Sequence, residues 1–243
     1  MTKQIVNWQT AMLTNSGNVR EYNEDSGLAK PQNQLWVVAD GMGGHEAGDV
    51  ASKMITQTLD NIISSDDFTE YLDQVDDALI SVNQQLRILA RDKYHGRTIG
   101  STVVAMIAHS YYIAYLWVGD SRIYRVRNKE ITQLTRDHSE VQNMVDQGLL
   151  DAEDAELHPA ANVITRAIGA SDNLYLSVGI EETENEDIYI LCSDGLYRDI
   201  SEKELLQLST SDDVTAICEN MMHVALSREA KDNITLIITK STF

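Results

Sequence analysis

Residues 102–120 read TVVAMIAHSYYIAYLWVGD. Two runs rich in Val, Ile, Tyr and Trp flank the pair His109-Ser110, and this pattern predicts a β-hairpin whose second strand ends at Asp120. Residues 122–134 predict another hairpin, with its turn at Asn128-Lys129. Other short apolar runs that predict strands lie at 9–14, 35–39, 174–179, 188–192 and 234–239.

Helices are indicated by apolar residues that recur every three or four positions. This spacing covers residues 50–62, 68–89 and 214–225. Ser201 followed by Glu204 is typical of a capping box that begins one more helix. Because the strands come in clusters and the helices in pairs, we expect an α+β fold with antiparallel sheets and packed helices, not a doubly wound parallel sheet.

Length and charge limit the classes of function. The chain has 243 residues, which fits one domain spanning 1–243. It carries 38 acidic and 19 basic residues, a net charge of −19 that disfavours binding to nucleic acid or to an anionic membrane. No apolar run is long enough for a signal peptide or a membrane span, and there are only two cysteines. We therefore expect a cytoplasmic protein without disulfides.

Aspartates stand where apolar strands begin or end. Asp40, Asp120 and Asp194 follow WVVA, YLWVG and YILCS, and Asp232 precedes NITLIIT. Such an Asp can simply begin a turn. A carboxylate beside a buried strand is costly to desolvate, however, unless it is paired or binds a metal. Oxygen donors without Cys or His clusters favour Mg²⁺ or Mn²⁺ over zinc.

Several short motifs occur in a recognisable order. They are Arg20–Asp25 (REYNED), Asp40–His45 (DGMGGH), Gly100–Thr102 (GST), Val118–Arg122 (VGDSR), Asp137–Ser139 (DHS), Ser193–Gly195 (SDG) and Asp232-Asn233. In this order the chain resembles the compact bacterial members of the metal-dependent type 2C Ser/Thr protein phosphatases, from about Asn15 to Thr239. The resemblance implies a β-sandwich of two antiparallel sheets flanked by helix pairs, in four layers, with two metals in a cleft at one end.

The resemblance also implies a set of ligands. Asp40 would bridge both metals, and Gly41 would donate its backbone carbonyl. Asp194 and Asp232 would hold one metal. The pair Glu24 and Asp25 would serve the other metal directly or through water, with the direct ligand left open.

Two further roles are implied by the same resemblance. Asp120 would bind a third metal together with Asp194, and Arg20 would bind the substrate phosphate. With Mn²⁺ or Mg²⁺ as cofactor, a water activated between two metals would attack the phosphorus of phosphoserine or phosphothreonine in a phosphorylated protein. The enzyme would be a monomer and would oppose a bacterial Ser/Thr protein kinase.

Other interpretations stay open at this stage. Some relatives carry a histidine general acid directly after the Asp-Gly pair, where this chain has Met42; its nearest histidine is His45, which otherwise only orders a turn. Residues 192–198 (CSDGLYR) match the Cys-x5-Arg loop of cysteine-dependent phosphatases, but the aspartate would put negative charge into that cradle. The glycines of 41–46 (GMGGHE) lack the third glycine of a dinucleotide loop.

The irregular segment 139–172 contains the acidic run 151–156 (DAEDAE). By resemblance it is a flap beside the active site; otherwise it is a solvated connection. If it is a flap, its acidity predicts a preference for basic substrates. The main alternative to an enzyme is a non-catalytic module of the same fold that binds phosphoproteins, and retention of every acidic ligand type argues against it.

Overall fold

The computed structural model describes residues 6–43 and 46–243. One antiparallel sheet has the strand order β1-β11-β10-β7-β8. Its strands are β1 (Asn7–Asn15), β11 (Ile234–Thr242), β10 (Ile188–Cys192), β7 (Arg122–Arg127) and β8 (Glu130–Gln133). The first and last strands of the chain therefore lie side by side, which brings residues far apart in sequence to the same sheet.

The other sheet has the order β2-β3-β5-β6-β9, and β4 pairs with the end of β3. Its strands are β2 (Asp25–Lys30), β3 (Leu35–Met42), β4 (Gly100–Ser101), β5 (Val103–His109), β6 (Tyr112–Val118) and β9 (Ser177–Glu182). All of these pairings are antiparallel. The predicted fold class is confirmed.

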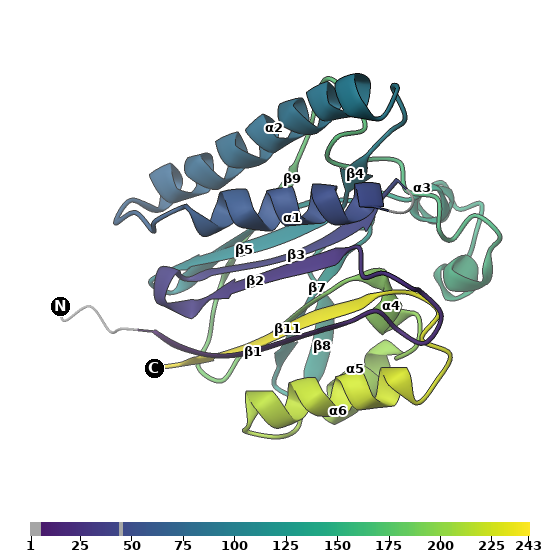
Figure 1. Ribbon diagram of the computed structural model, residues 1–243. Coiled ribbons are helices and arrows are strands. Elements are labelled where there is room, and N and C mark those ends of the chain that lie inside the picture. The colour runs from purple at the N-terminus through teal and green to yellow at the C-terminus, as the bar shows by residue number, and fades with distance from the viewer. Residues whose placement is uncertain (1–5, 44–45) are drawn as a thin grey trace.

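The helices cover the outer faces of the two sheets, which gives four layers (Figure 1). Helix α1 packs on β2 and β3 with α2 beside it, and α6 packs on β1 and β11 with α5 beside it. Their bounds are α1 (Glu46–Asp60), α2 (Phe68–Lys93), α3 (Glu140–Asp146), α4 (Asp194–Tyr197), α5 (Glu202–Leu208) and α6 (Val214–Leu226), with short 3₁₀ turns η1 (Pro31–Asn33) and η2 (Ala152–Leu157).

Local sequence explains where the helices begin. The Asp67 carboxylate accepts the backbone N–H groups of Thr69 and Glu70 at the start of α2. The predicted capping box of α5 is present, since the Glu204 carboxylate accepts the Ser201 backbone N–H at 3.0 Å. In the residues that the structure covers, no helix is both long and apolar enough to cross a bilayer.

Three apolar clusters hold the layers together. The cluster between the sheets is built from large side chains, among them Trp36, Tyr115, Trp117 and Tyr189. Two more clusters fill the spaces between each sheet and its helices. Burial at about 25 cal/mol per Å² makes these clusters the main source of stability. They hold the strand ends in a fixed frame.

Strand β9 and the turn of the first hairpin are shifted from their predicted positions, and strands β2 and β4 were not predicted. Strand β9 begins three residues later than the predicted 174–179, because its acidic end pairs with the start of β6. The first hairpin pairs His109 with Tyr112, so its turn lies at Ser110-Tyr111, with Ser110 at φ +54°. Strand β2 (DSGLAK) lacks strict alternation and forms through its pairing with β3.

Candidate metal and phosphate site

The predicted aspartates meet at one end of the sandwich. Strands β3, β6 and β10 end there and β11 begins there, because antiparallel neighbours alternate in direction. A cleft of about 320 Å³ opens at this end. Its lining residues are Arg20, Glu24, Asp40, Gly41, Met42, Gly43, Thr102, Asp120, Asn162, Ile164, Asp194, Arg198, Asp232 and Asn233.

Asn233 fixes the loop that carries Arg20 and Glu24. Its side-chain carbonyl accepts the Glu24 backbone N–H at 2.8 Å, and its amide donates to the backbone carbonyls of Ser16 and Tyr22, both at 3.0 Å. The loop is thereby folded onto the start of β11. As a result, Arg20 donates to Asp232 at 2.8 Å across more than two hundred residues of sequence.

Asp25 lies beneath the cleft lining. It opens β2 opposite Asp40 in the β2–β3 register and is only 5% exposed. The Ser193 hydroxyl donates to its Oδ2 at 2.7 Å, while its Oδ1 has no hydrogen-bond partner. Burial raises the pKa of the Asp25 carboxyl to about 7.

The other carboxylates of the site also have raised pKa values. Burial raises the pKa of Asp120 to about 7 and that of Asp40 well above its usual value; burial also raises the pKa of Asp194. In each case neighbouring carboxylates add to the effect of burial, and for Asp40 these are Asp25 and Asp194 first. The cleft therefore holds more negative charge than its own arginines neutralise.

The site fits divalent cations by its donor chemistry. Asp25 Oδ1 and Asp194 Oδ1 are buried oxygens without a hydrogen-bond partner, and such atoms are costly unless a ligand satisfies them. In the described part of the chain, no three Asp, Glu, His or Cys side chains are already placed around one point to bind an ion. Two of the carboxylates instead contact arginines: Asp232 pairs with Arg20, and Asp194 pairs with Arg198.

Gly41 is required by close packing. A Cβ at this position would lie 2.1 Å from the backbone carbonyl oxygen of Gly48 in α1 and 2.5 Å from that of Glu24. The Gly41 N–H also donates to the Glu24 carbonyl at 3.1 Å. Only glycine lets the start of α1 and the Arg20–Asp25 loop both pack against the end of β3.

Hydrogen bonds hold Asp40 in place. Its N–H donates to Thr102 Oγ1 at 3.2 Å, and its carbonyl accepts the Thr102 N–H at 2.9 Å and the Ser101 hydroxyl at 2.9 Å. The Thr102 hydroxyl in turn shares a 2.7 Å hydrogen bond with Ser121. These contacts give the Gly-Ser-Thr and Gly-Asp-Ser motifs a common task, which is to position the Asp40 backbone.

The interpretation as a cysteine-dependent phosphatase does not fit the geometry. Cys192 is fully buried in β10 and does not line the cleft, and burial raises the pKa of its thiol to about 12. The dinucleotide interpretation also fails, because Gly41 and Gly43 line the carboxylate cleft. Gly44 and His45 lie outside the described residues, so the proposed histidine is not placed.

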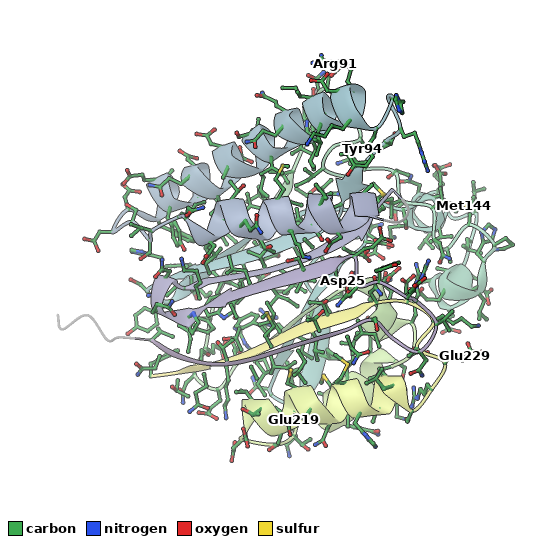
Figure 2. The ribbon with its side chains drawn as sticks, in the orientation of Figure 1. Asp25, Arg91, Tyr94, Met144, Glu219 and Glu229 are labelled. Carbon is green, nitrogen blue, oxygen red and sulfur yellow. The ribbon has the colours of Figure 1, made fainter. Side chains whose placement is uncertain are left out.

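Sequence reasoning missed part of the site. Asn162 and Ile164, from the segment 139–172, line the cleft. The bridge between Ser101 and Ile168 joins that segment to β4, and the bridge between Ser139 and Ile164 lies within it. Arg198 is predicted only as the arginine of the Cys-x5-Arg match, yet its guanidinium contacts Asp194 at 2.8 Å. Its position four residues after Asp194, one turn along a short helix, was the available signal. Figure 2 labels Asp25 at this same end, between the sheets.

Comparisons with known proteins agree with the resemblance. The sequence profile of the family described as protein phosphatase 2C matches residues 19–237. Protein phosphatase PhpP of Streptococcus pneumoniae serotype 2 is 34% identical over 238 residues, which cover 95% of this chain and 96% of that protein. Serine/threonine phosphatase stp of Listeria welshimeri is 31% identical over 238 residues, covering 93% of each.

Solved structures give the same result. PppA, a key regulatory component of T6SS in Pseudomonas aeruginosa, has a TM-score of 0.90 at 37% identity, covering 97% of this chain and 98% of that one. The catalytic domain of PstP in complex with two manganese ions has a TM-score of 0.88 at 29% identity, covering 98% and 100%. The chain therefore belongs to the protein phosphatase 2C family.

Proposed function

We propose that this chain is a metal-dependent protein phosphatase that hydrolyses phosphoserine and phosphothreonine in proteins. One observation carries the proposal: five carboxylates and Arg20 line a single cleft, and Asp194, which is one of them, keeps a buried oxygen without a hydrogen-bond partner. The chemistry of these donors suits two Mn²⁺ or Mg²⁺ ions. Similarity to a PstP structure that contains two manganese ions supports the same cofactor.

The proposed ligand roles are those that the family resemblance implies. Asp40 would serve both ions and the Gly41 carbonyl would be a further ligand. Asp194 and Asp232 would hold one ion, and the pair Glu24 and Asp25 would serve the other directly or through water. Once bound, the ions would lower the pKa of a water between them and neutralise the phosphoryl oxygens. The packing around Gly41 and the hydrogen bonds at Asp40 fix the backbone of these two residues.

Arg20 is the phosphate-binding residue in this proposal. Its side chain is 54% exposed at the cleft, so it can leave Asp232 and reach a substrate. The guanidinium offers two parallel N–H donors to two phosphoryl oxygens, which lysine cannot do in the same way. The neighbouring Asp232 raises the pKa of Arg20 through its hydrogen bond, so the cation stays charged.

The finer statements about partners and location are also proposals. We propose one catalytic domain over residues 1–243, a monomer, active in the cytoplasm against proteins phosphorylated by a cognate bacterial Ser/Thr kinase. The acidic segment 151–156 supports a preference for basic phosphopeptides. Equal turnover of matched basic and acidic phosphopeptides would contradict that preference.

Phosphate release from a phosphothreonine peptide tests the function. We expect turnover with Mn²⁺, complete loss with excess EDTA, and recovery when Mn²⁺ is restored. Cys192→Ser is the control and should keep its activity, because Cys192 does not line the cleft. A chain that binds the phosphopeptide but stays inert with every divalent ion would favour the non-catalytic module.

A further inference from the structure

Arg198 stands between two carboxylates that the resemblance assigns to a third metal. Its Nη2 lies 2.8 Å from Asp194 Oδ2 and 3.7 Å from Asp120 Oδ2. The two aspartate side chains are only 11% and 6% exposed, and the arginine side chain is 24% exposed. One guanidinium thus faces both members of this carboxylate pair.

The backbone builds this arrangement. Asp194 and Arg198 are one helical turn apart, and the Arg198 N–H donates to the Asp194 carbonyl at 3.1 Å. The neighbouring Tyr197 hydroxyl donates to the Asp120 carbonyl at 3.1 Å, and the Arg122 guanidinium lies 3.6 Å from the centre of the Tyr197 ring. Helix α4 therefore packs on the Asp120 turn, and this contact fixes the backbone position from which the Arg198 side chain extends.

The oxygens of Asp194 are divided between two tasks. Oδ2 is taken by Arg198, while Oδ1 is buried without a hydrogen-bond partner. The free oxygen leaves Asp194 able to bind an ion together with Asp232. Asp120 is in a different position. To bind a third ion it would have to share Asp194 Oδ2, and Arg198 already contacts that oxygen.

The positive charge of Arg198 disfavours a divalent ion between Asp120 and Asp194. A guanidinium cannot lose its proton in a protein, so it stays a full positive charge. A divalent cation a few ångströms away would be repelled in proportion to the product of the two charges, and low exposure weakens solvent screening. The same guanidinium already offsets one of the two negative charges.

We propose that Arg198 takes the place of a third divalent ion between Asp120 and Asp194, so that this chain binds two such ions. The inference rests on the proposed function, which requires the two-ion site. It also makes Arg198 a built-in counter-ion, in contrast to Arg20, which reaches Asp232 from a loop and is 54% exposed.

The test counts Mn²⁺ bound per chain by isothermal titration, with free Mn²⁺ measured by electron paramagnetic resonance. We expect two ions for the wild type, three for Arg198→Met, and two again for the double variant Arg198→Met/Asp120→Asn. Arg228→Met is the control for loss of a nearby arginine; Arg228 pairs with Glu204 outside the cleft and should leave the count at two.

Three ions in the wild type would overturn the inference, since Arg198 would then have moved aside. Equal counts in the wild type and Arg198→Met would overturn it as well. Thermal melting in EDTA shows whether each variant is folded before its count is read. Fewer than two ions in the wild type would instead contradict the proposed two-ion function, and the inference would fall with it.

Discussion

Strand β10 has a buried aspartate beyond each end, and the two aspartates differ in their hydrogen-bond partners. Asp187, before the strand, is 1% exposed and accepts hydrogen bonds from Arg127 Nε at 2.7 Å and Nη2 at 2.6 Å. It also accepts the Glu184 N–H at 2.7 Å and the Tyr189 hydroxyl at 3.1 Å. Asp194, after the strand, keeps one oxygen without any partner.

On the proposed function, this difference separates a structural carboxylate from a metal-binding one. At Asp187 the protein supplies the counter-charge and the donors itself, so the pair contributes to the fold. Around Asp194, several carboxylates lie together without enough counter-charge or hydrogen-bond donors. This arrangement does not stabilise the fold until a cation binds. Strand β10 is therefore preceded by a carboxylate with hydrogen bonds to both oxygens and followed by one that has an oxygen without a hydrogen bond.

Asp194→Asn should produce the largest change. It removes a ligand charge from the cleft, so phosphopeptide turnover with Mn²⁺ should fall on the order of 10³-fold. In EDTA the variant should melt no lower than the wild type, because a buried charge beside other carboxylates has been removed. Undiminished turnover would contradict the assignment of this end of β10.

Asp187→Ala should act on stability instead. It leaves the Arg127 guanidinium without its buried partner, so the free energy of unfolding in urea should drop by about 3 kcal/mol. The folded fraction should keep its kcat within about twofold, since this end lies away from the cleft. If Asp187→Ala lost activity and kept its stability, the proposed division of β10 would be wrong.

The pH dependence should differ with and without metal. The carboxyls of Asp25 and Asp120 have folded pKa values of about 7, above about 4 in the unfolded chain. Between these values the folded state binds more protons, so metal-free stability should decrease as pH rises from about 4 to about 7.

Saturating Mn²⁺ competes with the proton of Asp25, which belongs to the proposed two-ion site, so the stabilisation that Mn²⁺ provides should increase over the same pH range. Melting temperatures at pH 5 and pH 8, in EDTA and in Mn²⁺, check both signs. Parallel curves in the two conditions would show that Asp25 does not serve the metal site.

Glu156→Gln should have the smallest effect. Glu156, in η2, pairs with Arg122 at 2.6 Å and is 42% exposed, so it ties the segment 139–172 to the body of the protein by a partly screened ion pair. Loss of about 1 kcal/mol of docking would change KM for phosphopeptides up to about fivefold and leave kcat nearly unchanged. A large fall in kcat would instead place Glu156 at the chemistry.

The sequence predicted the elements with strong periodicity and the ligand types at their ends. Strand β2 was not predicted because Gly27 and the polar residues around it give no alternation of apolar and polar side chains. Only its pairing with β3 makes it a strand. The contacts of Arg198 could not be predicted for a related reason. Its partner Asp120 is far away in sequence and meets it only when β6 and α4 come together in the fold.

The most direct measurement is an anomalous difference map from a crystal soaked in Mn²⁺. Two peaks should lie beside Asp40, about 4 Å apart, within reach of Asp194, Asp232 and the Glu24-Asp25 pair. A map without peaks at Asp40, from crystals of protein that turns over phosphopeptide in the same Mn²⁺ buffer, would contradict the account.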